Sequence, residues 1–111
     1  MESILTSIKK LLGIDSEYKQ FDQDIIMHIN STFMTLSQLG VGPEAPVVIA
    51  DDLATWDAAF GDISYIEAIK SYTYLKVKML FDPPTSSFVM ESMNRQAAEF
   101  EFRLQIQSEI K

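Results

Sequence analysis

Few residues of this chain have the types and spacing that acid–base catalysis needs. The single histidine, His28, has Asp24 four residues before it and Thr32 four residues after it. A His–Asp pair at this spacing is a common contact on a helix surface, so we expect a structural or solvated histidine, with pH sensing as the alternative. No serine stands in a nucleophile-elbow context, and the four glycines form no phosphate-binding loop. The sequence therefore predicts no catalytic residue.

Acidic residues are concentrated between Phe21 and Ile69, a stretch without lysine or arginine. Carboxylate oxygens are the ligands of calcium and magnesium, but the alternating spacing of an EF-hand loop is absent. We expect a solvated acidic surface, which as a functional site would select or repel protein partners by its charge. We predict no metal site and no cofactor, since a metal-dependent enzyme would need a convergent cluster. The acids are Asp22, Asp24, Glu44, Asp51, Asp52, Asp57, Asp62 and Glu67.

Two groups of aromatic residues could act in recognition. Trp56 and Phe60 share one side of a short predicted helix, and we expect them to hold a loop against the core. The alternative is an anchor in a partner's pocket. Tyr65, Tyr72 and Tyr74 could stack on bases of single-stranded nucleic acid, but only three lysines accompany them on this segment. We favour the packing of a central helix for these tyrosines.

Composition predicts one globular domain. The chain has 111 residues, of which 47% are hydrophobic and 23% are charged. Its net charge of −7 lacks the basic footprint of a nucleic-acid binder. The absence of cysteine excludes disulfide scaffolds, thiolate zinc sites and cysteine nucleophiles. No apolar run approaches the ~20 residues that cross a bilayer, and the N-terminus lacks the order of a secretory signal, so we expect a soluble, non-exported protein.

The first half of the chain contains two predicted helices, residues 2–12 and 22–39, each with apolar residues on one face. Gly13 and Gly40 are placed to end them, and Asp22 is placed to cap the second. Two basic residues fall on the side of the first helix opposite its apolar face: Lys9 and Lys10.

Residues 40–61 read as a long irregular loop, because glycine and proline punctuate the segment. Residues 46–49 could form a short strand. Asp51 or Asp52 is expected to cap a short helix that ends at Gly61.

The second half of the chain contains two more predicted helices. Residues 63–81 are apolar on nearly all faces, as in a helix that is buried or that meets a partner on its second side. Residues 86–110 carry two apolar stripes, more than one core contact needs. The first comprises Val89, Met93, Ala97, Phe100 and Leu104, and the second Phe88, Phe102, Ile106 and Ile110. Together the segments predict an all-α fold: a single small four-helix domain over residues 1–111, with the long loop between the second and third main helices.

The order of these segments carries a family resemblance over nearly the whole chain. A leading helix closes as KKLLGI (9–14), an acidic second helix begins DQDIIMHIN (22–30), and the loop contains TWDAAFGD (55–62). The most specific element is LKVKMLFDPP (75–84), followed by a helix with Asn-Arg-Gln and Glu-Phe-Arg patterns. The chain thus resembles the head–tail connector, or adaptor, proteins of tailed bacteriophages, a group that includes the HK97-like and SPP1-like connectors.

The resemblance implies a structural protein of the virion neck, assembled in the host cytoplasm, and not an enzyme. Such a protein would form a ring of about twelve copies beneath the portal and bind the next neck or tail protein. DNA would pass through the ring without sequence-specific binding, aided by an acidic surface that repels phosphates, and no membrane would be involved. The competing class is a monomeric or dimeric helical regulatory module that binds a protein without forming a ring.

The resemblance also indicates where contacts between subunits and with the portal would lie. The loop before the third main helix and the C-terminal segment are the expected regions. Glu99 lies four residues before Arg103, a spacing that also supports a helix. The expected interface residues are Trp56, Asp57, Phe60, Phe102, Arg103 and Ile106.

Overall fold

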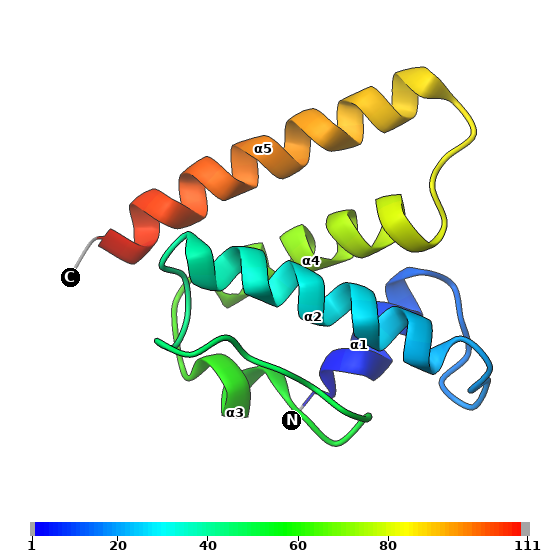
Figure 1. The fold of residues 1–111 in the computed structure, drawn as a ribbon, viewed down its shortest axis with the longest axis horizontal. Helices are drawn as coiled ribbons and strands as arrows, with labels where there is room; N and C mark the ends of the chain where they lie inside the picture. The colour runs from blue at the N-terminus through cyan, green and yellow to red at the C-terminus, as the bar shows by residue number, and fades with distance from the viewer. Residues whose placement is uncertain (1, 110–111) are drawn as a thin grey trace.

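The computed structural model describes residues 2–109 and confirms the predicted all-α fold (Figure 1). Its helices are α1 (Ile4–Leu11), α2 (Asp22–Gln38), α3 (Trp56–Phe60), α4 (Ile66–Phe81) and α5 (Ser87–Glu109). The short predicted helix around Trp56 is α3, and the four longer helices match the four main predicted segments. Ile110, assigned above to the second stripe of the last helix, lies outside the described residues.

Helix α4 is the centre of the domain, as its apolar surface predicts. Ile69, Tyr72 and Val77 are buried, and α4 packs against α1, α2 and α5 (Figure 1). Helix α2 contributes Ile25, Ile29 and other buried residues to the same core. The second side of α4 is therefore covered by the chain's own last helix.

Two glycines end α1 and α2 in the predicted way. Gly13 has φ of +81° and Gly40 has φ of +80°, a left-handed conformation in which glycine has no Cβ clash. After α1 the N–H of Ile14 donates to the carbonyl of Lys9 at 2.8 Å, and after α2 the N–H of Val41 donates to the carbonyl of Leu36 at 2.9 Å. These are the 6→1 bonds of Schellman motifs, which satisfy carbonyls at the helix ends.

The predicted helix starts need two corrections. Asp22 is the first residue of α2 rather than its N-cap, and Phe21 holds the cap position without a side-chain hydrogen bond. Thr55, not Asp51 or Asp52, caps α3, because its hydroxyl accepts from the N–H of Ala58. Asp51 instead accepts from the N–H of Leu53 in a local turn.

The loop between α2 and α3 runs beside the N-terminal residues and α2 without forming the strand considered for residues 46–49. Both backbone groups of Ile49 bond to the side-chain amide of Asn30, at 2.9 and 3.0 Å. A side chain thus supplies the pairing that a neighbouring strand would provide. The β-bridge observed lies elsewhere and joins Ser3 to Thr55.

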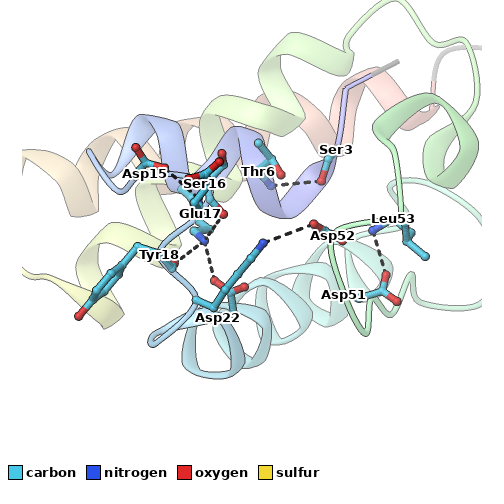
Figure 2. A network of polar contacts seen from close by, with 12 residues as sticks. Ser3, Thr6, Asp15, Ser16, Glu17, Tyr18, Asp22, Asp51, Asp52 and Leu53 are labelled. Atoms are coloured by element: carbon cyan, nitrogen blue, oxygen red, sulfur yellow. Dashed lines mark hydrogen bonds and ion pairs between the residues drawn. The ribbon is translucent and has the colours of Figure 1, made fainter.

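Lys9 is buried, contrary to its predicted place on the polar side of α1. Its Nζ lies 2.7 Å from Oδ1 of Asp22 and donates to the carbonyls of Ser16 and Tyr18 (Figure 2). The connection between α1 and α2 folds back over the end of α1 and covers the lysine. Two carbonyl acceptors and the negative charge of Asp22 compensate the ammonium group, which is how a buried charge is tolerated.

The molecule is a flat body with extents of 40 × 35 × 19 Å. In the view of Figure 1, α5 forms one long edge, and the loop between α2 and α3 lies at the opposite edge. Among residues 2–109, no helix has the length and apolar character needed to cross a membrane.

Candidate functional site

The outer face of α5 is a row of exposed apolar side chains. The inner face of the helix buries Ala97 and Leu104. On the opposite side, Phe88 is 74% exposed, Phe102 65% and Ile106 43%. Their separations of 14 and 18 residues are close to whole helical turns, so the three lie on one line about 27 Å long. We call this line, with the charged residues between its ends, the α5 ridge.

The α5 ridge carries two exposed charges, Glu91 and Arg95, for which no ion pair is seen within the described part of the chain. Arg103 pairs with Glu99, one turn before it. Glu101 points inward, where its carboxylate meets Tyr72 and lies 3.9 Å from Lys76. Arg95 is exposed near the middle of the row, and no ion pair engages it among residues 2–109. The ridge is thus apolar at both ends, with the carboxylate of Glu91 and the guanidinium group of Arg95 between them.

The hydroxyl of Tyr72 joins the centre of the core to the inner side of α5. It donates a 2.7 Å hydrogen bond to Oε2 of Glu101, while the Tyr72 ring is fully buried. Burial first, and this bond second, raise the pKa of the Tyr72 phenol well above its ordinary value of 10.0. The bond joins the Glu101 side of α5 to α4 and, together with the burial of Ala97 and Leu104, is consistent with a ridge that faces outward.

A second apolar surface lies between α2 and the loop that follows it. Here Met27 and Met34, two turns apart on the exposed side of α2, face Ile49 and Ala50 across a shallow groove of about 720 Å³. Both methionines are about half exposed. The amide of Asn30 forms part of the floor and fixes the far wall through its bonds to Ile49. We call this surface the α2 groove, lined by Gln23, Ile26, Met27, Asn30, Ser31, Met34, Ile49 and Ala50.

The surroundings of the α2 groove are acidic. Asp24 is exposed on α2 beside Gln23, and Asp51 and Asp52 follow Ala50. Asp52 lies 3.7 Å from Lys19, an exposed pair that solvent screens. Because no basic residue occurs between Phe21 and Ile69, the charge around the groove is predominantly negative.

Trp56 and Phe60 belong to the core, so the expectation that they hold the loop against it is confirmed. Trp56 is 2% exposed, and its indole N–H donates to the buried Ser7 hydroxyl at 2.8 Å. The rings of Trp56 and Phe60 both pack edge-on against Phe33 of α2. The chain's own residues cover both rings, and neither has the exposed face that an anchor in a partner's pocket requires.

The remaining predicted interface residues are exposed and fall into two places. Asp57 lies on α3, and Phe102, Arg103 and Ile106 lie together on α5. Helices α3 and α5 lie at different sides of the molecule in Figure 1, but the end of α3 and the last turns of α5 meet, because Phe60, Gly61 and Ser108 line one pocket.

The prediction of interface residues missed the two methionines of the groove. Met27 and Met34 are seven residues apart on the helical face opposite Ile25, Ile29 and Leu36, and this spacing was visible in the sequence. Flexible thioether side chains exposed in a row are typical of adaptable binding surfaces. The bounds of the groove, in contrast, depend on where the loop returns to α2.

The tyrosines and the histidine, considered from the sequence as functional residues, are buried or half-buried. Tyr72 is buried and Tyr65 and Tyr74 are half-buried, so core packing is the arrangement observed for the tyrosines. His28 is half-buried, and its carbonyl accepts from the Thr32 hydroxyl. Within residues 2–109, no three histidine or acidic side chains come together in a way that could hold a metal ion. The surfaces described are suited to binding another protein through apolar and ionic contacts.

Comparison with known proteins identifies one family. A family model described as phage connector protein matches residues 4–111. No curated protein and no solved structure matches the chain.

Proposed function

Because the chain belongs to the phage connector protein family, we propose that it is a structural protein of the virion neck. In this proposal it forms a ring beneath the portal, extends the DNA channel and provides the attachment surface for the next neck or tail protein. The family match over nearly the whole chain is the observation that carries the proposal.

The exposed surfaces of the domain support ring assembly. A ring forms when one surface of each copy binds a different surface of the next and the rotation between copies closes. The α5 ridge and the α2 groove are two such surfaces, apolar and separate. Large apolar side chains in a row on a small domain are typical of binding sites. A ring of about twelve copies, as in the connectors that the sequence resembles, is the assembly we propose.

The proposed partners are the portal protein and the next neck or tail protein, with DNA passing through the ring. The net charge of −7 suits a channel protein, because a negative wall repels phosphates and lets DNA slide. Such a role needs no sequence-specific contact with bases and no catalytic step. The alternative is a monomeric or dimeric helical module that binds one regulatory partner.

Light scattering across a range of protein concentrations, with negative-stain images, tests the proposal. The chain is measured alone and with the portal ring of the phage that encodes it. A closed ring in either sample supports the connector role. A chain that stays monomeric or dimeric and does not bind the portal overturns it and favours the regulatory module.

A further inference from the structure

We propose that the α5 ridge of one copy docks in the α2 groove of the next copy, and that this contact closes the ring. The inference rests on the proposed function and adds the residues that make the subunit interface. The occupant of the groove is thus a second copy of this chain, contributing Phe88, Phe102 and Ile106.

Shape and chemistry match between the two surfaces. The ridge is convex and ends in aromatic and branched side chains, whereas the groove is concave and presents Met27 and Met34. Methionine adapts its shape to an inserted side chain, and its sulfur makes favourable contacts with aromatic rings. Exposed aromatic residues such as Phe88 and Phe102 are the type that contributes most to binding when they enter a pocket.

Charge also favours this pairing. Arg95 is the cation of the ridge that has no ion pair among residues 2–109, and Asp24 and Asp51 are exposed beside the groove. Glu91, an exposed acid of the ridge, lies one turn closer to the Phe88 end. Opposite charges across an interface select the partner and its register. A symmetric ridge-to-ridge contact would occupy the ridge of both copies and stop at two. A closed ring, as in the proposed function, needs contact between unlike surfaces, which the ridge and the groove supply.

The arrangement of the fold prevents a copy from filling its own groove. Helix α5 packs on α4 at one edge of the flat molecule, and the loop that bounds the groove lies toward the opposite edge (Figure 1). The two surfaces can meet only between copies. Each copy then offers one ridge and one groove, and the chain of contacts ends only when a ring closes.

Mixing two variants tests the contact. Phe102→Asp disables the ridge and leaves the groove intact, while Met34→Asp does the reverse. Each variant alone is expected to associate about thirtyfold more weakly than the unchanged chain, as for the loss of an interface hot spot. Their mixture still contains one intact ridge and one intact groove, so it should form a dimer and stop there. Leu11→Asp, at an exposed apolar residue of α1 outside both surfaces, should assemble normally.

Either variant assembling like the unchanged chain overturns the inference, as does a mixture that stays monomeric. Circular dichroism of each variant shows whether a loss of assembly reflects unfolding. A variant that has unfolded is replaced by the milder Phe102→Ser or Met34→Ser, to which the same two outcomes apply.

Cross-linking provides a second test, because the chain has no cysteine of its own. Met34→Cys and Phe102→Cys are placed in one chain and treated with a short bismaleimide under assembly conditions, with the portal ring present. A ridge-to-groove contact yields a ladder of covalent multimers. Leu11→Cys with Phe102→Cys, the matched control, should yield no ladder.

The two tests separate failure of the interface from failure of the function. A ring without the ladder overturns the ridge-to-groove contact and leaves the connector role intact. A chain that neither forms a ring nor cross-links, alone or with the portal, overturns both proposals.

Discussion

The hydroxyl of Tyr72 donates a hydrogen bond of 2.7 Å to the carboxylate of Glu101 and so joins the centre of the core to the last helix. Helix α5 buries Ala97 and Leu104, a small apolar contact for 23 residues. A polar contact from a buried ring therefore contributes to how α5 is oriented. The same contact keeps Phe102 and Ile106 on the outer side.

Tyr72→Phe should lower the free energy of unfolding by about 1.5 kcal/mol, because a hydrogen bond to a charged group is lost. Urea denaturation followed by circular dichroism measures the change. Tyr74→Phe is the matched control, since Tyr74 is half-buried on the same helix. Equal stability of the two variants would show that the bond to Glu101 does not hold α5.

Stability should fall as the pH rises above about 10, and Tyr72 should account for part of the fall. The folded chain keeps the Tyr72 proton because its pKa is raised, whereas the unfolded chain loses it near the ordinary value of 10.0. The unfolded state then binds fewer protons, and stability decreases by at most about 1.4 kcal/mol per pH unit for this group. Lys70, whose pKa its bond to Glu2 raises most, adds a decrease in the same direction. Denaturation series from pH 9 upward should therefore show a shallower decline for Tyr72→Phe, and identical slopes would contradict the assignment.

Lys9→Met should destabilise the fold by about 3 kcal/mol, since removing one partner of a buried ion pair leaves the other unpaired. Asp22 loses its ion-pair partner, and the carbonyls of Ser16 and Tyr18 lose their donor. Lys10→Met is the matched control, because Lys10 is exposed on the same helix and should change stability by less than about 0.5 kcal/mol. Chemical denaturation of both variants measures the two changes in stability. Equal midpoints would refute the stabilising role of Lys9.

Trp56→Ala should cost about 4 kcal/mol, because a large buried side chain and its hydrogen bond to Ser7 are removed. Asp57→Ala, one residue further along α3 and exposed, should leave stability nearly unchanged. Thermal unfolding and portal binding are measured for both. A folded Trp56→Ala chain that loses only portal binding would restore Trp56 as an interface residue.

Phe102→Asp should leave the free energy of unfolding within about 0.5 kcal/mol of the unchanged chain, because the side chain is 65% exposed. Ala97→Asp, on the buried side of the same helix, should instead unfold or detach α5, since it places an unpaired charge in the core. Urea denaturation of the two variants compares how much the exposed and the buried faces of α5 contribute to stability. A large loss of stability for Phe102→Asp would mean that the ridge serves folding rather than binding.

Local patterns in the amino-acid sequence were enough to predict the helical class and most of the helix ends. Apolar spacing is a local property, and it placed the four main helices. Gly13 and Gly40 end α1 and α2 because the left-handed conformation there favours glycine. The same spacing identified Trp56 and Phe60 as residues that hold the loop, although not the ring of Phe33 that receives them.

Contacts between distant segments, in contrast, follow from how the whole chain folds. Lys9 is buried because the chain after α1 folds back over it, which no local pattern of α1 shows. The strand considered for residues 46–49 is replaced by the bonds from Asn30, a residue nineteen positions away from Ile49. Likewise, the α2 groove exists only where the returning loop meets the exposed methionines.

The two apolar stripes of the last helix show most clearly what local patterns predict and what packing adds. Both stripes are apolar, so their residue types alone could not tell which one faces the core. Packing on α4 turns Ala97 and Leu104 inward and leaves Phe88, Phe102 and Ile106 in solvent. The choice depends on the surface that α4 presents, including the Tyr72 hydroxyl, and a helix meets that surface only when the chain has folded.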